Sequence, residues 1–124
     1  LTEPGGGSDV QALKTVANRD GGDYLITGSK MFITNAENGG AFAVLVKTDR
    51  NANPPHRGMS CFIVEKPTEG FSVGKKLDKL GYRGVDTCEL VFDNCEVSSD
   101  NLIGGKEDCF TCPIGNEKVI HKVW

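Results

Sequence analysis

The chain has 124 residues, in which 14 Lys and Arg oppose 17 Asp and Glu for a formal net charge of −3. Nothing in this balance points to nucleic-acid binding, which would need a basic stripe, and no apolar run approaches the roughly 20 residues needed to cross a bilayer. A hydrophobic content of 38% with 25% charged residues indicates a globular segment with one modest core. Because the sequence starts inside a motif, we expect it to be a piece of a longer polypeptide.

Short segments rich in β-forming residues follow one another along the chain. Residues 14–18 and 24–33 are separated by the turn cluster Arg-Asp-Gly-Gly-Asp, which predicts a hairpin. Further strands are predicted over residues 41–48, 60–65, 71–73 and 87–92, with a looser continuation over 94–97. With 16 glycines available for turns, this spacing predicts a mainly β fold, a small β-barrel or sandwich of short antiparallel strands. Helical spacing is found only over residues 116–124, which predict a short helix.

Five cysteines do not frame the chain as a disulfide scaffold would. Cys61 and Cys88 lie in apolar strand-like runs, where a thiol behaves as a small hydrophobic side chain. This usage predicts a reducing, intracellular compartment. The pair Cys109-x-x-Cys112 is the only metal-like spacing, and Cys95 and His121 are the candidates to complete a zinc site. Inert thiols are the favoured interpretation, so we predict no metal.

Two stretches carry residues suited to holding a ligand. Residues 1–9 read Leu-Thr-Glu-Pro-Gly-Gly-Gly-Ser-Asp, and residues 28–36 read Gly-Ser-Lys-Met-Phe-Ile-Thr-Asn-Ala. Consecutive glycines permit close approach of the backbone to a ligand. Taken singly, each feature has an ordinary interpretation: the glycines form a flexible turn, Phe32 belongs to the core, Thr34 is a strand residue, and Glu3 is a solvated carboxylate.

In this order and spacing the two stretches resemble the flavin-contacting segments of the acyl-CoA dehydrogenase family. Residues 70–76, 79–84 and 86–93 are similar to the second half of that family's middle β domain. The resemblance covers residues 1–105, which we predict to form this domain. Residues 106–124 form a divergent tail, because Pro113 and Gly115 interrupt the long helix that relatives begin there.

The resemblance implies FAD as the cofactor, bound by Leu1, Thr2, Phe32, Ile33 and Thr34. A flavin ring needs hydrogen-bonding groups at its edge and a flat or aliphatic group against its face. The threonine hydroxyls and the Phe32 ring provide such groups. The position of Phe32 is often Trp in the family, so an indole donor is missing here. Val85 stands where many relatives have Ser.

By the same resemblance, Ser8 lies beside a bound acyl-CoA substrate. The lysines at positions 75, 76 and 79 either approach a CoA phosphate or form a solvated face, and the solvated face is favoured. Arg83 is expected to be a structural ion-pair or hydrogen-bond partner.

The implied reaction is the α,β-dehydrogenation of an acyl-CoA thioester in fatty acid or amino acid catabolism. Its base is a glutamate of the family's C-terminal helical domain, so no catalytic residue is predicted here and the segment alone is expected to be inactive. An electron-transfer flavoprotein as acceptor, a homo-oligomer (dimer or tetramer) and a location in the mitochondrial matrix or bacterial cytoplasm are implied as well. Two alternatives stay open: a non-catalytic, truncated β module that acts in protein interaction, and an acyl-CoA oxidase-like flavoprotein.

Overall fold

Six β-strands form the framework of residues 1–104, the part of the chain that the computed structural model describes. They are β1 (Val16–Asp20), β2 (Asp23–Thr34), β3 (Ala41–Lys47), β4 (Met59–Glu65), β5 (Phe71–Lys76) and β6 (Thr87–Val97). Three short 3-10 helices accompany them: η1 (Val10–Ala12), η2 (Pro55–Gly58) and η3 (Ser99–Asn101). The predicted tail helix and the Cys109–Cys112 pair lie outside the described residues.

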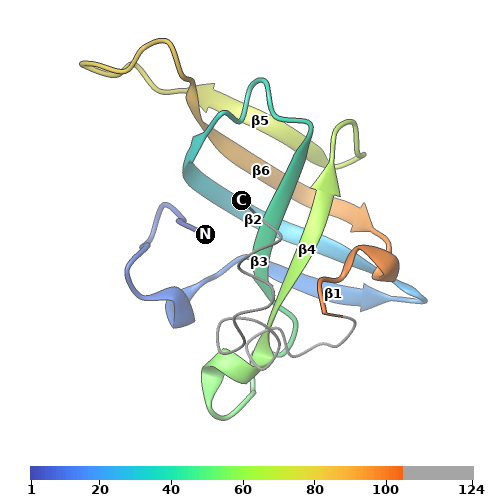
Figure 1. Ribbon diagram of the computed structural model, residues 1–124. Helices are drawn as coiled ribbons and strands as arrows, with labels where there is room; N and C mark the ends of the chain where they lie inside the picture. The colour runs from blue at the N-terminus through green and yellow to red at the C-terminus, as the bar shows by residue number, and fades with distance from the viewer. Residues whose placement is uncertain (105–124) are drawn as a thin grey trace.

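The strands form one sheet in the order β4-β3-β1-β2-β6-β5. Neighbours are antiparallel except β1 and β3, which run parallel and pair only at Val16 and Lys47. Because this junction is so short, the β3–β4 hairpin turns away and crosses over the other four strands (Figure 1). The predicted mainly β, antiparallel fold is confirmed. The sheet is open, with β4 and β5 at its edges, so the barrel is not supported.

The main core fills the space between the crossing hairpin and the remaining strands. The Tyr24 ring of β2 lies 4.8 Å from the Phe62 ring of β4, which joins the two layers. Within the layer formed by the remaining strands, the Phe71 ring stacks on the Phe92 ring, with 5.1 Å between their centroids. Cys88 is buried in this core, as the sequence predicted, and burial raises the pKa of its thiol.

The pairing of β2 with β6 contains two irregularities. Ile26 pairs with Cys95 but Gly28 pairs with Phe92, so β6 carries one extra residue there. Lys30 pairs with Leu90 but Ile33 with Cys88, so β2 carries the extra residue at the second site. A bulge of this kind reverses which side chains face the core. Residues 31 and 32 form this second bulge, which we call the β2 bulge.

Candidate functional site

The N-terminal segment lies against the β2 bulge (Figure 1). The backbone N–H of Met31 donates to the carbonyl of Thr2 at 2.8 Å. Beyond Thr2 the chain reverses, because Glu3 and Gly6 exchange backbone hydrogen bonds of 2.9 and 3.1 Å. Gly7 then returns alongside Thr2, and a Cβ at that position would lie 3.1 Å from the Thr2 Cγ2 atom. The two sequence motifs therefore meet in space.

The β2 bulge exposes an aromatic ring. Phe32 is 63% exposed and has a φ of 60°, in the left-handed region that a bulky side chain rarely adopts. Leu1, one residue before the carbonyl that binds the bulge, is 58% exposed. The ordinary interpretation of Phe32 as a core residue is therefore wrong. Residues held in this backbone region cost about 1–3 kcal/mol each and cluster at binding sites.

The other predicted site residues differ in their surroundings. Thr34 ends β2 and is exposed, and Thr2 is half-buried. Ile33 is half-buried and packs against the main core, so its side chain is less available to a ligand than its backbone. Ser8 is exposed in the loop before η1. Its neighbour Asp9 caps that helix by accepting the backbone N–H of Gln11 at 3.1 Å.

A buried ion pair lies beneath the two segments. The Lys30 ammonium donates to Glu3 Oε1 at 2.8 Å, and their side chains are only 2% and 7% exposed. The same carboxylate accepts the hydroxyl of Thr15 at 2.5 Å and the backbone N–H groups of Lys14 and Thr15 at 2.6 and 3.0 Å. The expectation that Glu3 is solvated is wrong, and Lys30 and Thr15 were not singled out from the sequence.

This network sets the charge of Glu3. Burial acts to raise the pKa of the carboxyl, but the hydrogen bonds from Lys30, Thr15 and Lys14 outweigh it and lower the pKa from 4.5 to about 2. Burial also lowers the pKa of Lys30, against the opposing effect of Glu3. Gly28 makes the network possible, since a Cβ there would lie 2.7 Å from the Thr15 hydroxyl.

A second buried carboxylate holds the other end of the exposed segment. Asp86 accepts the backbone N–H of Glu37 at 2.7 Å and the side-chain amide of Asn38 at 3.1 Å. Its carbonyl accepts the N–H of Asn35 at 3.0 Å, directly after Thr34. The bonds to the carboxylate, that from Glu37 foremost and that from Asn38, lower the pKa of Asp86. The exposed end of β2 is thus anchored by a buried acid on each side.

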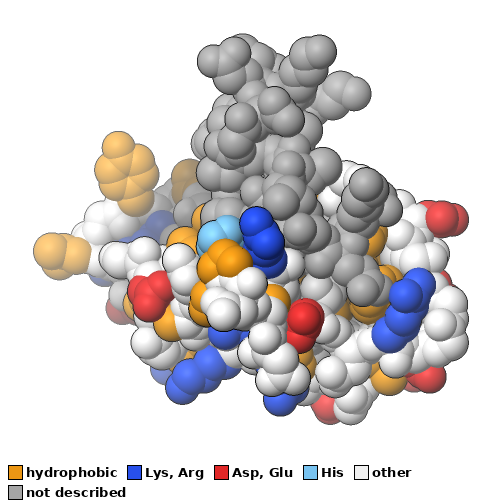
Figure 2. Space-filling view, turned by 90° about the horizontal axis from the view of Figure 1, so that it is seen from below, with side chains coloured by type: hydrophobic (Ala, Val, Ile, Leu, Met, Phe, Trp, Pro, Cys, Tyr) orange, Lys and Arg blue, Asp and Glu red, His pale blue; other side chains and the backbone are white. Residues whose placement is uncertain are grey.

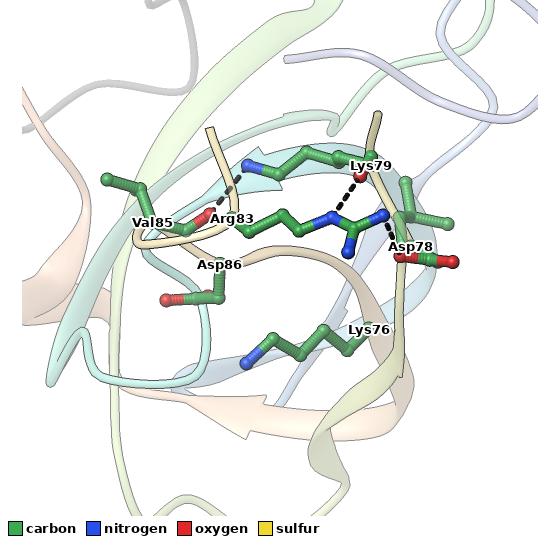
Figure 3. A pocket seen from close by; sticks show the side chains of 7 residues that line it. Lys76, Asp78, Lys79, Arg83, Val85 and Asp86 are labelled. Carbon is green, nitrogen blue, oxygen red and sulfur yellow. Dashed lines mark hydrogen bonds and ion pairs between the residues drawn. The ribbon is translucent and has the colours of Figure 1, made fainter. Parts of the chain in front are cut away.

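The loop over residues 77–86, which we call the β5–β6 loop, extends away from the sheet (Figure 1). It encloses a hollow of about 290 Å³ (Figure 3). Lys79 donates to the carbonyl of Val85 at 2.6 Å, and Arg83 donates to the carbonyl of Lys79 at 2.8 Å and lies 3.7 Å from Asp78 (Figure 3). The structural role predicted for Arg83 is confirmed, and Lys79 braces the loop from within.

Charge elsewhere is mixed. Lys76 pairs with Glu37 at 2.7 Å, and on the face seen in Figure 2 basic side chains are interspersed with acidic ones.

Among residues 1–104 no group of three metal-ligating side chains is found. In the same range no helix has the length and apolar character to span a membrane.

The fold and the paired segments define a class of β domain found in solved acyl-CoA dehydrogenases. The structure of the Geobacillus kaustophilus acyl-CoA dehydrogenase superposes with a TM-score of 0.85 at 44% identity, over 90% of this chain and 29% of that one. A structure described as an electron transferring flavoprotein of Acidaminococcus fermentans has a TM-score of 0.83 at 40% identity, over 90% and 29% of the two chains.

Residues 1–95 match the family model described as "Acyl-CoA dehydrogenase, middle domain", so the chain belongs to this family. The mitochondrial isovaleryl-CoA dehydrogenase of Pongo abelii is 47% identical over 104 residues, which are 84% of this chain and 25% of the relative. The chain thus spans about a quarter of the length of such relatives.

Proposed function

We propose that this chain serves as the flavin- and substrate-contacting domain of an FAD-dependent acyl-CoA dehydrogenase. The observation that carries the proposal is Phe32 beside the Leu1–Thr2 segment: the residue is 63% exposed, and its backbone has a strained, positive φ. Strained backbone positions concentrate at ligand-binding sites, and an exposed apolar ring marks a surface that makes contacts.

The residues present fit FAD. Phe32 and Leu1 offer apolar surface for the face of a ring, and the hydroxyls of Thr2 and Thr34 form no hydrogen bond within residues 1–104. A Cβ at Gly6 would meet nothing within 4 Å, so the adjacent backbone is open to close approach. We assign the flavin to Leu1, Thr2, Phe32, Thr34 and the backbone of Ile33.

In the reaction, these residues would bind and orient the ring, and Ser8 would contact the acyl-CoA. When bound, FAD supplies a hydride acceptor for the α,β-dehydrogenation. No residue of this segment is assigned as the base. We further propose an electron-transfer flavoprotein as acceptor, a homo-oligomeric assembly, and a mitochondrial or bacterial cytoplasmic location. The description of one relative as mitochondrial supports the location, and the likeness to an electron transferring flavoprotein supports the acceptor.

A hybrid enzyme tests the proposal. Residues 1–104 replace the matching segment of the Geobacillus kaustophilus enzyme, which supplies the rest of the polypeptide. We expect a yellow protein whose visible flavin absorption is bleached by acyl-CoA under anaerobic conditions. A folded hybrid that binds no FAD would overturn the proposal, with the unmodified host as the control. Reoxidation of the reduced hybrid by oxygen alone would indicate an oxidase instead.

A second function is favoured by one observation. Leu80 and Tyr82 of the β5–β6 loop are 102% and 90% exposed, and exposed apolar groups favour association. A non-catalytic interaction module would form defined oligomers as the isolated 124-residue chain, and its hybrid would be colourless. Loss of those oligomers in a Leu80→Ser, Tyr82→Ser double variant would assign them to the loop.

A further inference from the structure

The Glu3–Lys30 pair connects the two segments to which we assign the flavin. Glu3 directly follows Thr2, and Lys30 directly precedes the β2 bulge. Both charged side chains lie in the interior, and 2.8 Å separates Lys30 Nζ from Glu3 Oε1. One buried interaction therefore ties the start of the chain to the strand position where Phe32 turns outward.

Stability alone is a poor reason for such a pair. Removing two charges from water costs several kcal/mol per ion, and apolar residues of similar volume often stabilise a core as well or better. What an ion pair adds is directionality, because it is satisfied in one arrangement only. That property is useful where two separate segments must keep a fixed relative position.

The surrounding hydrogen bonds restrict the carboxylate further. Thr15 and the backbone of Lys14 hold both Glu3 oxygens on the β1 side. Lys30 then reaches the same carboxylate from β2. The ammonium has little freedom to move without pulling the bulge with it, and the Thr2–Met31 hydrogen bond transmits the same constraint on the surface.

We infer that Glu3 and Lys30 are positioning residues that set the register between the Leu1–Thr2 segment and the β2 bulge, and so the shape of the flavin-binding surface. The inference rests on the proposed function, because the surface matters only if a flavin binds there. Neither residue is assigned a contact with the flavin. Their effect passes through Thr2 and Phe32.

The test compares three variants in the hybrid enzyme. Lys30→Met removes the ammonium but keeps the chain length. Thr15→Val perturbs the same carboxylate but leaves the link between the two segments intact. Lys76→Met removes a cation from the exposed Lys76–Glu37 pair, whose side chains are 56% and 55% exposed. For each variant, the FAD dissociation constant, the flavin absorption spectrum and midpoint potential, and the free energy of unfolding of the FAD-free protein are measured.

We expect Lys30→Met to weaken FAD binding about tenfold, equivalent to about 1.4 kcal/mol, and to shift the flavin spectrum. Thr15→Val loosens the carboxylate but keeps the Lys30 contact, so it is expected to lower stability and to change both flavin properties less than Lys30→Met does. Lys76→Met is expected to leave both flavin properties unchanged. If Lys30→Met does not fold, Glu3→Asp replaces it, since a carboxylate one methylene shorter draws the two segments into a new register and weakens FAD binding as well.

The outcomes separate the two proposals. Suppose that the unmodified hybrid binds FAD and that the folded Lys30→Met or Glu3→Asp variant has the same FAD affinity and flavin spectrum. That result overturns the positioning role and leaves the proposed function standing. Equal losses of FAD affinity in Lys30→Met and Thr15→Val overturn it too, because affinity then follows stability. An unmodified hybrid that binds no FAD overturns both proposals.

Discussion

The β2 bulge and the β5–β6 loop share an unusual backbone feature but are held in place differently. Each has an exposed aromatic residue in the left-handed region, Phe32 at φ 60° and Tyr82 at φ 54°. The bulge is held from beneath by a buried ion pair, whereas the loop is braced by hydrogen bonds and an ion pair at its surface, with Arg83 and Asp78 69% and 94% exposed. The bulge is therefore anchored to the protein interior, whereas the loop is held only by contacts at its own surface.

The largest expected effect comes from cutting the buried link. Lys30→Met leaves the Glu3 carboxylate buried without its ammonium, and loss of one partner of a buried pair costs about 3–5 kcal/mol. Lys76→Met in the exposed pair is expected to cost less than about 1 kcal/mol. Urea unfolding of the purified chain measures both. Similar losses in the two variants would show that the bulge is held no more firmly than the surface.

Acid titration probes the same pair without a change in its neighbours. Because folding lowers the pKa of Glu3 from 4.5 to about 2, its contribution is complete above pH 4.5 and disappears as the pH falls towards 2. The shift corresponds to about 3 kcal/mol of unfolding free energy. Urea unfolding between pH 6 and 2 should show this loss in the unmodified chain and not in Glu3→Gln. If the free energy of unfolding falls equally with pH in the unmodified chain and in Glu3→Gln, the acid sensitivity belongs to other carboxyl groups.

Gly28→Ala tests how closely β2 must pack against Thr15 in the Glu3–Lys30 network. The glycine has a φ of 146°, and a Cβ would lie 2.7 Å from the Thr15 hydroxyl and 2.8 Å from its Cα. Overpacking of this kind costs about 1–3 kcal/mol, so we expect a loss of about 2 kcal/mol. Gly22→Ala is the control, since a Cβ there meets nothing within 4 Å. Equal stability of the two variants by thermal unfolding would mean that Thr15 moves freely.

The two regions also differ in how far the sequence predicts them. Runs of β-forming residues located the strands, and the resemblance of two motifs to flavin-contacting segments implied that residues 1–9 and 28–36 converge. Strand alternation also places Lys30 in phase with the inward-facing Tyr24 and Ile26. A lysine at a core position requires a buried counterion, and this signal would have indicated an acidic partner in the interior, which the structure shows to be Glu3.

Other features depend on tertiary pairing and leave no local signal. Strict alternation would send Phe32 inward with Lys30, and only the extra residue opposite β6 turns it out. A bulge that contains no glycine cannot be predicted from the sequence of its own strand, because the pairing with the partner strand determines where it forms. The crossing of the β3–β4 hairpin over the other strands likewise follows from the single Val16–Lys47 pairing of β1 with β3, which no segment pattern specifies.

Relief of backbone strain gives the smallest expected effect on stability and the finest comparison. Glycine adopts a positive φ freely, so Phe32→Gly and Tyr82→Gly each remove about 1–2 kcal/mol of strain while adding about 0.5–1 kcal/mol of unfolded-state entropy cost. Both variants are expected to raise the free energy of unfolding slightly, because the two rings are 63% and 90% exposed and bury little surface. In the hybrid enzyme only Phe32→Gly should weaken FAD binding. A stabilised Phe32→Gly variant with unchanged FAD affinity would mean that the strain at the bulge, like that at Tyr82, has no part in holding the flavin.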